Sequence, residues 1–176
     1  MLNLLQHPLF PERSRRESKH RPRNKLGMTM KRKANEQHFF IADTHFGDER
    51  ILRYENRPFL SVDKMNSEII KRWNERGKKF LVKGNHDTKS NEHYRRAGFC
   101  EVYDLPVIFQ NFWLLSHEPL YVCQNMPYAN IFGHVHANPI YKDFSEQSFC
   151  VSVERINYTP VSFDEIKRVI AEEKTK

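Results

Sequence analysis

The sequence of 176 residues predicts an α/β fold, and three observations support this class. Short apolar runs rich in aromatic and β-branched residues recur from about residue 37 onward, as expected for buried strands. Two later segments repeat their apolar residues with the period of an α-helix. Polar clusters containing Asp, Asn and His directly follow several of the apolar runs. The predicted strands therefore deliver reactive side chains at their carboxyl ends.

The predicted strands divide into two groups. Residues 37–42 and 79–83 form strands that end in Asp-Thr-His and Gly-Asn-His-Asp, and the helix between them indicates a parallel βαβ unit. The later runs are separated by Pro, Asn and Gly, which favours antiparallel pairing. These later strands cover residues 99–103, 107–110, 112–116, 129–132 and 149–153.

Two helices have recognisable start signals. Either Ser61 or Asp63 can cap the first, which extends to about Asn74. The last helix begins at Ser162, and Glu165 three residues later completes a capping-box pattern.

The net positive charge is confined to the N-terminal region. Residues 1–37 contain ten Lys or Arg and three Asp or Glu, which accounts for the whole formal charge of +7. Without an apolar period, residues 1–36 are predicted to be a disordered basic tail preceding a folded domain over 37–172. Such a tail could bind nucleic acid by releasing counterions, which is a separate hypothesis for function. A solvated extension, or a start codon assigned too early, is the favoured explanation of this segment.

The composition excludes several classes of protein. No apolar run approaches the roughly 20 residues that cross a bilayer, so no membrane span is predicted. Cys100, Cys123 and Cys150 are odd in number and form no CxxC, so they encode neither a disulfide framework nor a zinc knuckle. We therefore expect a cytoplasmic protein with reduced thiols.

The polar clusters after the strands suggest metal chemistry. Residues two apart at a strand end lie on the same side of the chain, so Asp43 can converge with His45, and His134 with His136. Mixed carboxylate and imidazole ligands suit Mn, Fe, Zn or Ni rather than calcium. The clusters are Asp43-Thr44-His45, Gly84-Asn85-His86-Asp87, Ser116-His117-Glu118 and Gly133-His134-Val135-His136.

The ordered motifs DxH, GNHD, a single His and GHxH resemble the calcineurin-like metallophosphoesterases, in particular small bacterial and phage phosphohydrolases. Residues 43–58, DTHFGDERILRYENRP, share this likeness, which extends from Phe39 to Ile170. The resemblance implies a four-layer α/β sandwich of mixed sheets, with one or two divalent ions, Mn first and Fe, Ni or Zn as alternatives. By position, it assigns Asp43, His45 and His136 to one ion and Asn85, His117 and His134 to the other.

The implied activity is hydrolysis of a phosphomonoester or phosphodiester by a metal-activated water. Two cations about 3.5–4 Å apart would lower the pKa of water and neutralise the charge that develops on the phosphoryl group. His86 would lie beside the phosphate and protonate the leaving oxygen or stabilise the phosphate oxygens, while Asp87 would fix the tautomer of His86. The expected partner is a phosphate-ester substrate.

The chain departs from the family pattern in one place. The family has a strand ending in Gly-Asp between the first two clusters, and its carboxylate bridges both ions. The Gly-Asp at 47–48 belongs to the first loop instead, so one strand-helix unit is missing, with the join near 73–77. Asp48, Asp63 and Glu75 are candidates to replace the bridging carboxylate. The alternative interpretation is a degenerate, weakly active or inactive homologue that acts as a pseudoenzyme or binding protein.

Overall fold

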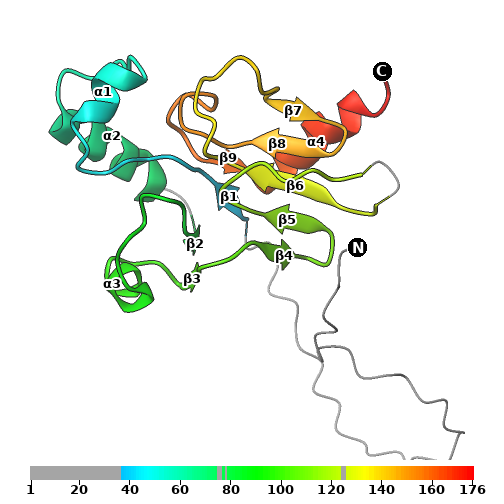
Figure 1. Cartoon of the computed structure of the whole chain (residues 1–176), viewed down its shortest axis with the longest axis horizontal. Coiled ribbons are helices and arrows are strands. Elements are labelled where there is room, and N and C mark those ends of the chain that lie inside the picture. Colours follow the sequence, from blue (N-terminus) through cyan, green and yellow to red (C-terminus); the bar gives the residue numbers. More distant parts are fainter. Residues whose placement is uncertain (1–36, 75–76, 78, 124–125) are drawn as a thin grey trace, which may run out of the picture. The chain divides into compact units, whose positions relative to one another are not determined.

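The computed structural model describes residues 37–74, 77, 79–123 and 126–176. The predicted tail, residues 1–36, and one proposed bridging acid, Glu75, lie outside these residues. The described part is a mixed α/β structure with several sheets and four helices, which confirms the α/β class (Figure 1). None of the helices in the described ranges is long and apolar enough to cross a membrane.

The largest sheet has five strands in the order β4-β5-β6-β8-β7. The three central strands are mutually parallel, and the two outer pairs are antiparallel. The predicted antiparallel arrangement is therefore wrong at the centre of this sheet, because long connections carry the chain back to the same end before each central strand. The strands are β4 (Val107–Phe109), β5 (Trp113–Leu115), β6 (Ala129–Phe132), β7 (Phe144–Ser145) and β8 (Ser148–Cys150).

One face of this sheet is covered by α4 (Phe163–Glu173). The predicted cap of this helix is confirmed, since the hydroxyl of Ser162 accepts from the amide of Glu165 at 3.2 Å. Its apolar stripe buries three side chains against the sheet. The resulting core contains Trp113, Ala129, Ile131, Phe149, Val151, Phe163, Ile166 and Ile170.

A second core lies under α1 (Arg50–Tyr54) and α2 (Val62–Asn74). The hydroxyl of Ser61 accepts from the amide of Lys64 at 3.3 Å, so Ser61 rather than Asp63 caps α2. This core packs the segment after the first polar cluster against residues 153–158, and it thereby fixes the loop that carries the cluster. Its buried members are Ile51, Met65, Ile69, Val153 and Tyr158.

Two short ladders complete the described sheets. β1 (Phe39–Phe40) pairs antiparallel with β9 (Val161–Ser162), and β2 (Phe80–Val82) pairs parallel with β3 (Glu101–Tyr103), which follows α3 (Asn91–Arg96). The predicted βαβ unit is wrong in its pairing, because among the described strands β1 and β2 are not neighbours.

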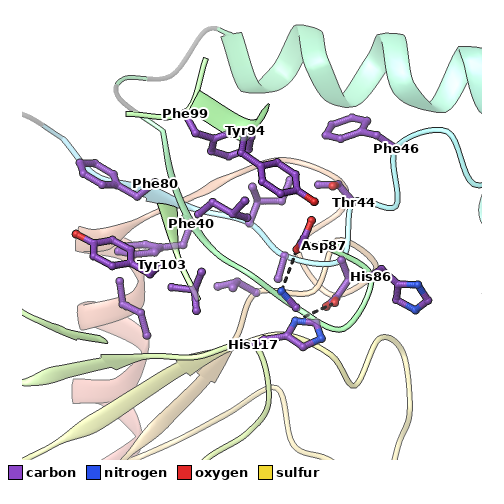
Figure 2. A pocket seen from close by; sticks show the side chains of 18 of the residues that line it. Phe40, Thr44, Phe46, Phe80, His86, Asp87, Tyr94, Phe99, Tyr103 and His117 are labelled. Carbon is purple, nitrogen blue, oxygen red and sulfur yellow. Dashed lines mark hydrogen bonds and ion pairs between the residues drawn. The ribbon is translucent and has the colours of Figure 1, made fainter. Parts of the chain in front are cut away.

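β1 and β2 line a common cavity of about 1280 Å³. Residues of both strands line it, among them Phe40, Leu81 and Val82. These side chains are only partly buried, and Phe80 is 41% exposed, although their sequence is typical of central strands. Figure 2 shows the cavity with Phe40, Phe80 and Tyr103 towards one end and His86, Asp87 and His117 towards the other.

Candidate metal centre

The first group of metal-type side chains lies beyond the ends of β1 and β6. One ligand-type atom from each of Asp43, His45 and His136 lies within 4.8 Å of the others. The carboxyl of Asp43 is 1% exposed, and its Oδ2 accepts from the amide of His134 at 2.7 Å and the hydroxyl of Ser152 at 2.6 Å. Its Oδ1 is buried and has no hydrogen-bond partner in the described part of the chain. An orphaned buried carboxylate oxygen beside two imidazoles fits a divalent cation.

A second group adjoins the first. The Nε2 of His117 lies 2.9 Å from Oδ1 of Asn85 and 2.9 Å from Nδ1 of His134. The other ring nitrogen of His117 lies 3.9 Å from Oδ1 of Asp43. The structure therefore brings together all six side chains that the sequence analysis assigned to metal ions, in two adjoining triplets.

Two glycines allow this close approach. A Cβ on Gly84 would lie 2.5 Å from the ring of His117, and one on Gly133 would lie 2.4 Å from Cβ of Ala42 and 2.8 Å from Oδ2 of Asp43. A Cβ at either position would therefore force a neighbouring side chain to move. The glycines that open the second and fourth polar clusters let neighbouring segments converge on Asp43 and His117.

The backbone of the candidate ligands is locally strained. Asp43, His45, His134 and His136 have φ values of 57°, 50°, 72° and 48°, in the left-handed region that residues with a Cβ rarely adopt. Each such residue costs on the order of 1 kcal/mol, and these conformations cluster at functional sites because the surrounding structure must enforce them. Here they turn alternate side chains of the DxH and GHxH motifs inward.

The pKa values of the imidazoles diverge. Burial lowers the pKa of His45, and the nearby positive charge of His136 and Arg57 lowers it further. Burial also lowers the pKa of His117, against the opposing charge of Asp43. For His136, burial acts to lower the pKa, but the hydrogen bond to Glu154 and the charge of Asp43 outweigh it, so this pKa is raised. His45 and His117 therefore favour the neutral form that binds metal ions.

His86 lies at the edge of the first triplet. Its exposed ring is 4.7 Å from the ring of His45, centroid to centroid. The predicted role of Asp87 needs correction. Its Oδ2 accepts from the amide of Gly84 at 2.9 Å, and none of the hydrogen bonds between described residues joins it to His86. Asp87 therefore stabilises the turn that presents Asn85 and His86.

Of the acids proposed to replace the bridging carboxylate, Asp48 lies beside the first triplet and Asp63 lies on the surface of α2. Oδ2 of Asp48 lies 3.8 Å from Nδ1 of His45, while its Oδ1 accepts from Nε of Arg50 at 3.0 Å. The hydrogen bond from Arg50 lowers the pKa of Asp48. Asp63 is exposed on the first turn of α2. Asp48 thus lies next to the first triplet, but its carboxylate is already paired with the guanidinium of Arg50.

The sequence analysis assigned neither Arg57 nor Glu154 to the metal centre. Both side chains are almost fully buried, and Nη2 of Arg57 lies 2.7 Å from Oε1 of Glu154. The same oxygen lies 3.1 Å from Nδ1 of His136. Glu154 directly follows the predicted strand 149–153, so the strand-end signal that identified the other clusters could have found it.

Comparisons with known proteins give relatives without a described activity. No family model matches the chain. It is 31% identical over 170 residues to the uncharacterized protein MJ1445 of Methanocaldococcus jannaschii. This alignment covers 75% of this chain and 90% of the relative. The alignment is 170 positions long but takes in only 75% of the 176 residues of this chain. Within the aligned region, the relative therefore has residues that this chain lacks.

A solved structure supports the α/β fold alone. The crystal structure of AQ665 from Aquifex aeolicus, a protein of unknown function, superposes with a TM-score of 0.52 at 23% sequence identity. The match covers 76% of this chain and 98% of that one.

Proposed function

The chain belongs to the family of the uncharacterized protein MJ1445 of Methanocaldococcus jannaschii, and we propose a function for it from the residues of its candidate metal centre. The proposed activity is metal-dependent hydrolysis of a phosphomonoester or phosphodiester, in the manner of the calcineurin-like metallophosphoesterases. The observation that supports it concerns Asp43: it belongs to the first donor triplet, and its buried Oδ1, which has no hydrogen-bond partner among the described residues, lies 3.9 Å from Nδ1 of His117 in the second. Carboxylate, amide and imidazole donors in this arrangement suit Mn, with Fe, Ni or Zn as alternatives.

The chain's own residues divide the work. Asp43, His45 and His136 would hold one divalent ion, and Asn85, His117 and His134 a second. Such ions, when bound, lower the pKa of water and neutralise charge on a phosphoryl group. His86 is exposed beside His45 and would donate a hydrogen bond or a proton to the phosphate ester.

The finer fold belongs to the same proposal. We interpret the structure as a four-layer α/β sandwich that lacks one strand-helix unit between β1 and β2. The cavity between these strands and the additional residues of the M. jannaschii relative both support this interpretation. Asp43 would then be the carboxylate that joins the two triplets, since it belongs to the first and lies 3.9 Å from His117 of the second, whereas Asp48 is paired with Arg50.

The test is a metal titration combined with a hydrolysis assay on the full chain. We expect Mn²⁺ to bind and to support hydrolysis of p-nitrophenyl phosphate or bis-p-nitrophenyl phosphate. Asp43→Asn and His134→Ala should abolish hydrolysis, whereas His93→Ala, which alters an exposed histidine outside both triplets, should not. Binding of Mn²⁺ without hydrolysis of either ester would favour the alternative, a binding protein without turnover. Absence of Mn²⁺, Fe²⁺, Ni²⁺ and Zn²⁺ binding would refute the proposal.

A further inference from the structure

We infer that Arg57 and Glu154 form a buried positioning pair: Glu154 orients the imidazole of His136, and Arg57 ties Glu154 to the backbone of Asp43 and Thr44. The part of this inference that concerns metal affinity rests on the proposed function. The part that concerns the orientation of His136 rests on the contacts alone.

The contact between Glu154 and His136 selects one form of the imidazole. Oε1 of Glu154 lies 3.1 Å from Nδ1 of His136, and the carboxyl side chain is 5% exposed. An ionised carboxylate can only accept, so Nδ1 must carry the hydrogen. The lone pair of the neutral ring is then on Nε2, which is the nitrogen free to bind a metal ion. Carboxylate–histidine pairs of this kind fix both the tautomer and the direction of metal-binding imidazoles.

Arg57 extends this contact to the other end of the first triplet. Its side chain is 0% exposed, and its Nε donates to Oε1 of Glu154 at 2.9 Å. Its Nη2 donates to the carbonyl of Asp43 at 2.6 Å, and its Nη1 to the carbonyl of Thr44 at 2.9 Å. The planar guanidinium presents five N–H groups, so one side chain can reach all three acceptors.

The carbonyls that Arg57 binds belong to the strained turn of the first cluster. Asp43 and His45, on either side of Thr44, both have positive φ. Charge-assisted hydrogen bonds to this turn stabilise a conformation that the sequence alone disfavours. The pair thus connects Asp43 and His136, two members of the first triplet that are 93 positions apart in the chain.

Direct metal binding by Glu154 is the competing interpretation. One ligand-type atom from each of Glu55, His136 and Glu154 lies within 4.8 Å of the others, and Oε2 of Glu154, like Oδ1 of Asp43, is buried without a hydrogen-bond partner among the described residues. However, the guanidinium of Arg57 lies 2.7 Å from Glu154, where it already supplies positive charge and would repel a metal ion. This contact favours a positioning role for Glu154.

The first experiment measures the tautomer of His136 directly. Imidazole ¹⁵N shifts of the metal-free full chain are recorded at pH 8.5, and His136→Gln identifies the signals that belong to His136. We expect hydrogen on Nδ1 and a bare Nε2. Hydrogen on Nε2 in the wild type would overturn the inference, whether or not the protein binds metal ions.

The second experiment removes the pair. Arg57→Met combined with Glu154→Leu replaces a buried ion pair by apolar side chains of similar size, a change that folds often tolerate. We expect the tautomer of His136 to shift towards hydrogen on Nε2 and the affinity for Mn²⁺ to fall 10–100-fold. The matched control is Arg96→Met with Glu92→Leu, which removes an exposed pair and should change neither quantity. Unchanged tautomer and affinity in a folded Arg57–Glu154 variant would show that the pair is purely structural.

A third variant separates positioning from direct binding. Glu55→Gln should leave Mn²⁺ affinity within about twofold of the wild type. If it lowered affinity as much as loss of Glu154, both carboxylates would be ligands and the positioning role would be wrong. If the wild type bound no Mn²⁺, the proposed function would fail, whereas the tautomer of His136 would still decide the role of Glu154.

Discussion

Oδ1 of Asp43 and Nδ1 of His117 lie 3.9 Å apart, and this contact joins the two triplets of candidate ligands. The carboxyl of Asp43 uses its other oxygen to bind Ser152 and the amide of His134, so its position is fixed from behind. The oxygen that faces His117 is buried and has no hydrogen-bond partner among the described residues. Asp43 therefore belongs to the first triplet and presents an unpaired oxygen to His117 of the second, as a shared metal ligand would.

Asp43→Asn should remove metal binding and preserve the fold. The amide oxygen can still accept from Ser152 and His134, which leaves the amide nitrogen at the position that faces His117. A neutral donor there cannot bind a cation, so we expect the affinity for Mn²⁺ to fall at least 100-fold, which corresponds to about 2.7 kcal/mol. Isothermal titration calorimetry measures the affinity, and thermal unfolding without metal checks the fold. Retained affinity in a folded variant would contradict the assignment of Asp43.

Gly133→Ala should reduce stability, because the new Cβ would lie 2.4 Å from Cβ of Ala42 and 2.8 Å from Oδ2 of Asp43, both closer than ordinary contact. Overpacking of this kind costs roughly 1–3 kcal/mol of unfolding free energy. Gly77→Ala is the matched control, since its Cβ would meet an oxygen at an ordinary 3.5 Å. Urea denaturation measures both variants, and equal stability of the two would contradict the close approach at Gly133.

The sequence predicts individual helices and strands better than it predicts which strands pair. The limits of β6 and the cap of α4 follow from local patterns, an apolar run and a Ser followed by Glu, and the structure agrees with both. The pairing of β1 with β9 joins residues more than 120 positions apart, and no local pattern encodes it. Long-range packing decides such pairings, which is why the expected βαβ pairing of β1 and β2 was wrong.

The same distinction applies to the candidate site. Asp43 and His45, or His134 and His136, are recognisable because each motif places two metal-type residues at one strand end. Glu154 stands alone after its strand, and its importance emerges only when His136 and Arg57, far away in the chain, pack against it. Metal binding itself stays a prediction from this geometry.

Metal affinity should rise with pH because protons compete for His136. Burial alone would lower the pKa of this imidazole, but the hydrogen bond to Glu154 and the charge of Asp43 raise it above 6.5. The group is therefore still partly protonated at pH 6.5, and its proton must leave before the ring can bind a cation. His45 and His117, whose pKa values are lowered, are largely neutral by then. Mn²⁺ titrations at pH 6, 7 and 8 should show increasing affinity, and a flat or inverted series would contradict the role of His136.

The cavity between β1 and β2 should make β2 one of the least protected strands. Among the described strands β2 pairs only with β3, and its side chains face the cavity instead of a packed core. β5 has the same length of three residues but is paired on both sides. Opening of β2 should therefore cost less free energy, and its amides should exchange at least tenfold faster than those of β5, a difference of about 1.4 kcal/mol. Hydrogen–deuterium exchange followed by mass spectrometry compares the two segments in one sample. Equal protection would mean that the gap beside β2 is closed in solution.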